Sequence, residues 1–249
     1  MGLGTILLYG ALAAAANIAG GLWITSRERM PQWALQLLIA LGAGFMLAAV
    51  FLEVLPHSLE MWDRGSRAPW VLFLVGYFLI QLFEHTLAPH FHFGEETHHE
   101  EMLEPRAAYT AVGALAMHTF FDGISIASGF VIDAQLGMVI FIAILLHKLP
   151  EGFTVASIML AAGRGARSAW RATVFIAAAT LLGAATVAVF RDLAPYTLPL
   201  SAGVTLYVAA SDLLPEVNHK GGYRTALVVF VGVALYYAME LLLSGVHTH

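Results

Sequence analysis

The sequence predicts an all-α polytopic membrane protein with a bundle of eight spanning helices. Two observations support this prediction. Of its 249 residues, 59% are hydrophobic and only 12% charged, and its mean hydropathy is +0.76, whereas about a quarter of the residues in a soluble domain are charged. The apolar residues form runs of roughly twenty, the length that an α-helix needs to cross about 30 Å of hydrocarbon. We expect residues 1–249 to form a single transmembrane domain.

Hydropathy places eight spans along the chain. They cover Thr5–Thr25, Ala34–Met61, Trp70–Ala88, Ala107–Val131, Gln135–Ala161, Ala169–Phe190, Leu198–Asn218 and Thr225–Leu243. The first run resembles a signal peptide, but it is long, and its basic residues, Arg27 and Arg29, follow it. We therefore interpret it as the first span.

The basic residues predict that both termini face outside. In that orientation, eight of the twelve lie on cytoplasmic segments and three on outer ones, while Lys148 lies inside a span. The cytoplasmic set is Arg27, Arg29, Arg106, Arg164, Arg167, Arg171, Lys220 and Arg224, and the outer set is Arg64, Arg67 and Arg191. The net charge of −5 is spread over loops and leaves no basic face for nucleic acid. The compact loops are typical of a prokaryotic inner (plasma) membrane protein.

The longest loop, at about residues 89–106, is rich in His and Glu and is cytoplasmic in this orientation. It contains His90, His92, His98, His99, Glu95, Glu96, Glu100, Glu101 and Glu104. Two interpretations stay open: a solvated acidic linker, or weak and exchangeable capture of metal ions.

Ionisable residues inside the spans are the candidates for function, because each costs at least about 2.5–3.5 kcal/mol at the bilayer centre. Four spans carry an i, i+4 pair on one helix face. The pairs are Glu53 and His57, His118 and Asp122, His147 and Glu151, and Asp212 and Glu216. The chain has no cysteine, so a metal ion must be bound by nitrogen, oxygen or thioether ligands.

Proline precedes the second member of three pairs, as Pro56, Pro150 and Pro215. A proline kinks its helix and frees a backbone carbonyl, and kinked polar helices at mid-depth are typical of transporters. The likeness of residues 53–57 (EVLPH) to residues 212–216 (DLLPE) indicates that the second and seventh spans are counterparts in an internal repeat.

The ligand chemistry alone leaves three hypotheses. Two imidazoles and two carboxylates carry a formal charge of about −2, which suits Zn²⁺, Fe²⁺, Mn²⁺ or Cd²⁺. Such a site could serve transport, an intramembrane zinc hydrolase with an activated water, or a sensor that binds metal without flux. The His-Glu-x-x-His pattern of many zinc hydrolases is absent. We expect no enzyme and no prosthetic group, only a transported ion.

Residues 118–123 (HTFFDG) and 147–152 (HKLPEG) resemble the paired signatures of the ZIP (Zrt/Irt-like) metal-transporter family, His-Asn-x-x-Asp-Gly and His-Lys-x-Pro-Glu-Gly. The eight spans, the His-bearing loop and residues 206–216 are also family-like. The resemblance implies an internal inverted repeat, import of a divalent metal by alternating access, and a homodimer. It places His118, Asp122, His147 and Glu151 on metal-binding positions and aligns Met46 with an additional ligand.

Two departures from the family pattern bear on the site. Thr119 stands where the family usually has Asn; its hydroxyl still offers an oxygen lone pair, so a contact there stays open. Lys148 stands where relatives with two adjacent metals can have an acidic residue, and the sixth span is free of acids until Asp192. We therefore expect one principal metal ion with a fixed positive charge beside it.

The outer pairs have two interpretations. Glu53, His57, Asp212 and Glu216 could contact the passing ion as gates, or they could form structural hydrogen bonds. His85, near the end of the third span, is interpreted as a satisfied core residue.

Overall fold

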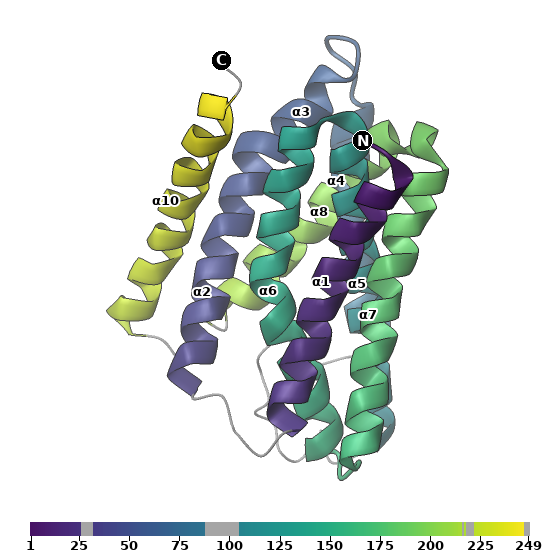
Figure 1. Ribbon diagram of the computed structural model, residues 1–249, viewed down its shortest axis with the longest axis vertical. Helices are drawn as coiled ribbons and strands as arrows, with labels where there is room; N and C mark the ends of the chain where they lie inside the picture. The colour runs from purple at the N-terminus through teal and green to yellow at the C-terminus, as the bar shows by residue number, and fades with distance from the viewer. Residues whose placement is uncertain (26–31, 88–104, 216, 218–221, 247–249) are drawn as a thin grey trace.

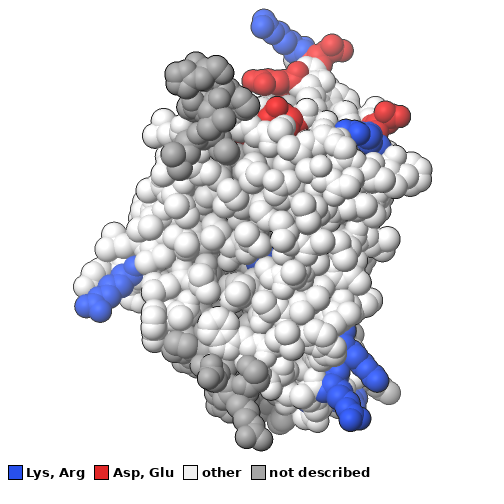
Figure 2. Space-filling view, viewed as in Figure 1, with Lys and Arg blue, Asp and Glu red and all other residues white. Residues whose placement is uncertain are grey.

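The computed structural model describes residues 1–25, 32–87, 105–215, 217 and 222–246 (Figure 1). Within these ranges the chain is helical and contains no strand. Eight helices are long and apolar enough to cross a membrane, which confirms the predicted fold class. In the view of Figure 2, most charged side chains gather toward the two ends of the molecule, and the band between them is largely uncharged apart from one basic side chain that projects at the left edge, a little below mid-height, as a chain solvated by lipid requires.

In the part of the chain that the structure describes, twelve helical segments make up the eight spans. They are α1 (Leu3–Thr25), α2 (Gln32–Ala49), η1 (Val50–Val54), α3 (Leu55–Glu60), α4 (Ala68–Leu87), α5 (Pro105–Ile132), α6 (Ala134–Ala161), α7 (Ala166–Val189), η2 (Arg191–Leu193), α8 (Ala194–Tyr207), η3 (Val208–Leu213) and α10 (Tyr223–Val246). The seventh span begins earlier than the predicted Leu198, because Pro195 lies in the first turn of α8, where a missing N–H costs nothing.

The turn between α5 and α6 is one residue long. Asp133 is extended, and its Oδ1 accepts hydrogen bonds from the backbone N–H groups of Gln135 and Leu136 at 2.8 and 3.0 Å. This N-cap satisfies donors that the first turn of α6 would otherwise leave free. Because the turn is so tight, α5 and α6 are antiparallel neighbours, and this brings the two central motifs together.

Two groups of helices make the closest contacts. One consists of α1, α5, α6 and α7, and the other of two separate pairs, α2 with α10 and α4 with α8. Glycines allow the backbones to approach within each group: a Cβ on Gly152 of α6 would lie 1.9 Å from the carbonyl oxygen of Asn17 in α1, and one on Gly203 of α8 would lie 1.9 Å from that of Phe73 in α4. Such small residues are typical of helix interfaces in membranes.

The helix contacts have the symmetry that an internal repeat predicts. The repeat would exchange α1 with α7, α2 with α8, α4 with α10 and α5 with α6. This exchange turns the α1–α6 contact into the α7–α5 contact, and the α2–α10 contact into the α8–α4 contact. All four contacts are among the most extensive between the described helices. The second and seventh spans are also both interrupted by a π-helical segment, η1 and η3, that ends two residues before a proline. Glu53 lies in η1 and Asp212 in η3.

Candidate metal site

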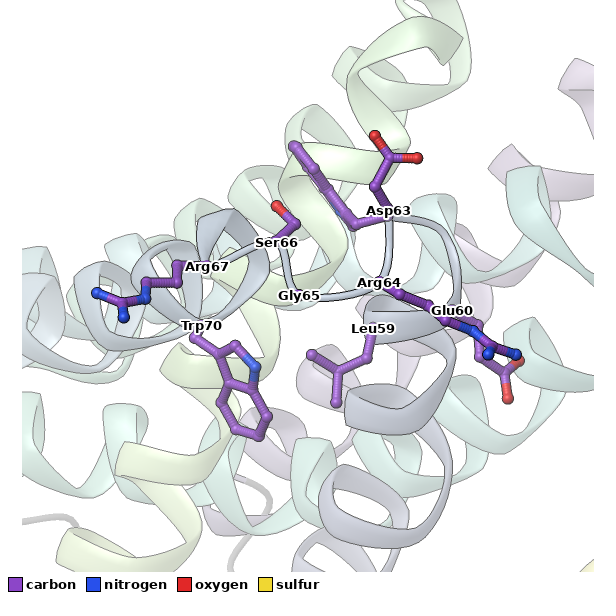
Figure 3. A pocket seen from close by; sticks show the side chains of 9 residues that line it. Leu59, Glu60, Asp63, Arg64, Gly65, Ser66, Arg67 and Trp70 are labelled. Atoms are coloured by element: carbon purple, nitrogen blue, oxygen red, sulfur yellow. The ribbon is translucent and has the colours of Figure 1, made fainter.

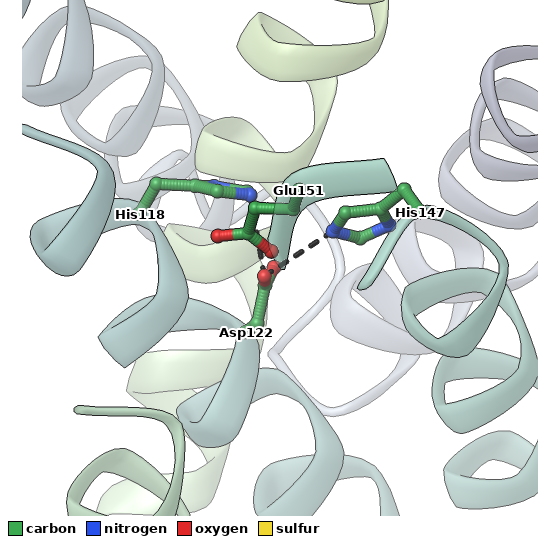
Figure 4. Close-up of side chains that lie close together, drawn as sticks. All are labelled: His118, Asp122, His147 and Glu151. Carbon is green, nitrogen blue, oxygen red and sulfur yellow. Dashed lines mark hydrogen bonds and ion pairs between the residues drawn. The ribbon is translucent and has the colours of Figure 1, made fainter. Parts of the chain in front are cut away.

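His118 and Asp122 of α5 and His147 and Glu151 of α6 converge in the middle of the bundle (Figure 4). Each can offer one ligand atom such that all four atoms lie within 4.8 Å of one another. None of the four residues is more than 3% exposed. The i, i+4 spacing places each pair on one helix face, and the short turn at Asp133 holds the two faces together.

Asp122 lies at the centre of the cluster. Its Oδ2 is 3.2 Å from Nε2 of His118 and 3.3 Å from Nε2 of His147. The Nδ1 atom of His147 lies 3.2 Å from the carbonyl oxygen of Ala143. A ring that donates from Nδ1 to that carbonyl presents the lone pair of Nε2 to the cluster, which is the usual arrangement of a histidine that binds a metal ion.

Several buried ligand atoms of the cluster have no hydrogen-bond partner among the described residues. They are Nδ1 of His118, Oδ1 of Asp122 and Oε1 of Glu151, and also Nε2 of His118, which lies 3.2 Å from Oδ2 of Asp122 without forming a hydrogen bond. Buried polar atoms are rarely left without a partner, because each costs about 1–3 kcal/mol. The imidazole and carboxylate atoms fit a divalent cation of the zinc type, which would satisfy several of them together.

Lys148 enters the same cluster and is fully buried. Its Nζ lies 2.6 Å from Oδ2 of Asp122 and 2.7 Å from Oε2 of Glu151. The cluster therefore carries a formal charge of −1, not the −2 counted from its two carboxylates alone.

Helix α1 fixes the position of the Glu151 segment. Pro150 interrupts the hydrogen-bond ladder of α6, and the neighbouring Gly152 and Leu149 lie directly against Asn17 and Gly20 of α1. A Cβ on Gly20 would lie 2.1 Å from the carbonyl oxygen of Leu149. The absence of side chains at both glycines thus allows α1 to support the kinked turn that carries Glu151.

Beyond the cluster, toward the end of the bundle that carries Asp133, the core is apolar. A cavity of about 10 Å³ there is lined by apolar side chains, including those of Val50, Val54, Ile140 and Ile144, and by two hydroxyl residues, Ser125 and Thr205. A space of this size holds one water molecule at most. The site is therefore closed toward this end.

Thr119 and Met46 are buried near the site, but the described contacts do not assign either as a ligand. The hydroxyl of Thr119 donates to the carbonyl oxygen of Ala116 in its own helix at 3.0 Å. Helix α2 approaches the site at Gly42, whose Cβ position lies 3.7 Å from Cβ of His147. Met46 is fully buried one helical turn further along. Both ligand roles stay predictions.

Glu53 is buried and hydrogen-bonded to another helix. Tyr236 of α10 donates its hydroxyl to Oε2 of Glu53 at 3.1 Å. The Nδ1 atom of the partly exposed His57 lies 3.1 Å from the carbonyl oxygen of Glu53 and 3.9 Å from its Oε1. Glu53 and His57 thus form a separate polar group with Tyr236, outside the four-residue cluster.

Asp212 forms a third polar group, with a residue that the sequence analysis missed. Its side chain lies close to that of Glu84 in α4, which also lies close to Tyr207. Glu84 lies inside the predicted third span, so the cost of an intramembrane charge could have identified it. The predicted partner of Asp212, Glu216, lies outside the described residues, as do residues 89–104 of the predicted His-rich loop, whose last two residues, Pro105 and Arg106, begin α5.

The fold and the cluster together define a polytopic membrane protein whose centre is suited to a divalent metal ion. The model of the ZIP zinc transporter family matches residues 3–112 and 100–240, so the chain belongs to the ZIP family.

The chain is also similar to eukaryotic proteins that are named zinc transporters. The zinc transporter YKE4 of Saccharomyces cerevisiae is 22% identical over 246 residues, 83% of this chain and 71% of that protein. Zinc transporter ZIP13 of Pongo abelii is 26% identical over 76% of this chain and 61% of its own length. A ZIP13 homolog of Drosophila melanogaster is 28% identical over 59% of this chain, and the match spans 45% of that protein.

Proposed function

We propose that this protein transports a divalent metal ion across the membrane, with Zn²⁺ as the first candidate and Fe²⁺, Mn²⁺ and Cd²⁺ as further ones. The observation that carries the proposal is the buried set of His118, Asp122, His147 and Glu151 in the middle of a spanning bundle, with ligand atoms that lack partners. The family supports zinc as cargo, whereas the ligands alone do not separate these metals.

The cargo is bound as a single ion. Lys148 occupies the position between Asp122 and Glu151 with a fixed positive charge, and a second divalent ion there would be repelled. Metal binding requires neutral imidazoles and ionised carboxylates, so protons compete with the metal and binding weakens as the pH falls.

Transport proceeds inward, with both termini outside. This orientation follows the excess of Lys and Arg in cytoplasmic segments, and it places the apolar cavity at Val54 and Ile144 on the outer side of the site. The site is then closed to the outside, and the ion enters only when the α1–α5–α6–α7 group moves relative to the α2–α10 and α4–α8 pairs. The compact loops support a prokaryotic inner membrane as the location and the family a homodimer as the assembly.

Reconstituted vesicles test the function directly. The double variant His147→Ala, Glu151→Ala is expected to abolish Zn²⁺ uptake and tight Zn²⁺ binding together. The matched control, His85→Ala with Asp192→Asn, removes one imidazole and one carboxylate from exposed positions and should retain uptake. His85 was predicted to be a core residue, but its side chain is exposed, with Nδ1 2.8 Å from the carbonyl oxygen of Gln81. Uptake that survives the first pair of substitutions contradicts the site, and zinc binding by the native chain without any flux contradicts transport.

A further inference from the structure

A hollow of about 590 Å³ opens between the end of α3 and the start of α4, far from the metal site along the chain (Figure 3). It is lined by residues 59, 60, 62–67 and 70, and we refer to it as the loop hollow. Gly65, with φ of +89°, lets the loop turn back over it. The indole ring of Trp62 packs edge-on against the ring of Tyr196 in α8, with 5.3 Å between the ring centroids.

The rim of the loop hollow carries free charges of both signs. Arg64, Arg67, Glu60 and Asp63 all line it and are exposed. Among the described residues, none of the four belongs to an ion pair within 4.0 Å. In Figure 3, Arg67 extends on the side of Trp70, whereas Arg64 extends on the side of Glu60. The rim thus offers donors for an anionic group and acceptors for a cationic group, with no net charge.

The floor of the hollow is apolar and lies at the edge of the membrane. The side chains of Leu59 and Trp70 face each other beneath the loop (Figure 3). Glu60 ends one spanning helix and Ala68 begins the next, so the hollow lies where the chain leaves the hydrocarbon. Tryptophan is enriched at this depth because its ring is apolar and its N–H polar.

We propose that the loop hollow binds a phospholipid whose headgroup is zwitterionic and bears a primary amine, as phosphoethanolamine does. The exposed side chains of Arg64 and Arg67 extend to opposite sides of the loop in Figure 3 and must turn toward the hollow for their guanidinium groups to donate to phosphate oxygens. The carboxylates of Glu60 and Asp63 accept from the ammonium. Leu59 and Trp70 contact the glycerol and the first methylenes.

The charges of the rim disfavour two other ligands. A site that collects divalent cations requires an excess of negative charge, and here two arginines cancel two carboxylates. A site for free phosphate needs neither the carboxylates nor the apolar floor. An amphiphile with both charges uses every part of the hollow.

Native mass spectrometry of the purified full chain tests the proposal, with titration of phosphatidylethanolamine and, separately, of phosphatidylglycerol. In Arg64→Gln, Arg67→Gln, the apparent Kd of the first phosphatidylethanolamine is expected to rise by about three- to tenfold, the effect of losing exposed charge-assisted contacts. Glu60→Gln, Asp63→Asn should reverse the preference, so that phosphatidylglycerol binds more tightly. Arg191→Gln is the matched control, because this arginine donates to the carbonyl of Met1 and does not line the hollow.

Two results would overturn the proposal. One is unchanged phosphatidylethanolamine affinity in the double arginine variant, or an equal loss in Arg191→Gln. The other is a dependence on Arg64 and Arg67 that is seen with inorganic phosphate but not with the lipid. Arg64→Lys, Arg67→Lys separates folding from binding, because it keeps the positive charges and is expected to retain at least half of the native affinity for the lipid.

Discussion

Nζ of Lys148 lies 2.6 Å from Oδ2 of Asp122, the carboxylate oxygen that also faces Nε2 of both histidines. A metal ion bound by His118 and His147 would contact this same oxygen. The lysine and the cargo therefore compete for Asp122, and the lysine stabilises the cluster when no metal ion is bound.

The first prediction concerns removal of this competitor. Lys148→Met is expected to increase Zn²⁺ affinity at least about tenfold, because a unit charge at contact distance in a buried site changes binding by more than about 1.4 kcal/mol. Without metal the variant should lose about 3–5 kcal/mol of stability, since two buried carboxylates lose their counter-charge. Isothermal titration and thermal unfolding, each with and without Zn²⁺, measure both effects.

Lys148→Arg is the control for charge and should keep the affinity within a few-fold of the native value. Lys148→Asp supplies a further carboxylate in place of the ammonium and is expected to raise the stoichiometry from one bound Zn²⁺ to two. Lower Zn²⁺ affinity in Lys148→Met would show that the lysine assists binding rather than competing with it.

How far the sequence predicts this site depends on the range of the interactions. The i, i+4 pairs and the cost of intramembrane charge identify His118, Asp122, His147 and Glu151, because helix periodicity is local. The contact of Lys148 with Glu151 is also local, at i, i+3 in α6. Its contact with Asp122 follows from the antiparallel packing of α5 on α6, which only the structure shows. Tyr236, the partner of Glu53, is 183 residues away in the chain, and no local pattern connects the two.

The second prediction concerns Gly152, next to the glutamate of the site. Gly152→Ala would place a Cβ 1.9 Å from the backbone oxygen of Asn17, so α1 must move away from α6. Loss of close packing in the core costs about 1–3 kcal/mol, and the displacement of Glu151 should weaken Zn²⁺ binding as well.

Gly113→Ala in α5 is the matched control, since nothing lies within 4 Å of its Cβ position. It should stabilise the helix by up to about 1 kcal/mol and leave Zn²⁺ binding unchanged. Thermal unfolding and zinc titration of both variants make the comparison, and equal effects at the two glycines would contradict the role of the α1–α6 contact.

The third prediction separates Glu53 from the metal cluster. Its hydrogen bond joins it to Tyr236 rather than to the four ligands, so Glu53→Gln should change the equilibrium Zn²⁺ affinity by less than about threefold. Glu151→Gln removes a ligand and should lower the affinity at least as much as the loss of a residue that only supports a ligand, which typically costs about 10- to 100-fold. Tyr236→Phe leaves a buried carboxylate oxygen unpaired and should cost about 1–3 kcal/mol of stability. Zinc titration of the three variants decides the matter, and a large loss of affinity in Glu53→Gln would make Glu53 a ligand.

The fourth prediction concerns the turn that holds the two ligand helices together. Although partial burial alone would raise it, the pKa of the Asp133 carboxyl is lowered from its ordinary value of 3.8, because the backbone N–H groups of Leu136 and Gln135 stabilise the charged form. Asp133→Ala should lower the stability by about 1 kcal/mol, the usual value of an N-cap, and Asp133→Ser should retain most of the native stability.

Because the pKa of Asp133 is lower in the folded state, the carboxylate stabilises the fold above pH 3.8, and its contribution declines as the pH falls through the lowered value. The stability difference between the native chain and Asp133→Ala, measured by thermal unfolding from pH 7 down to pH values near 3, should therefore shrink on acidification. The stability difference between Asp133→Ser and Asp133→Ala should not change with pH, because the serine hydroxyl does not titrate in this range. A difference that grows on acidification would mean that the charged carboxylate does not cap α6.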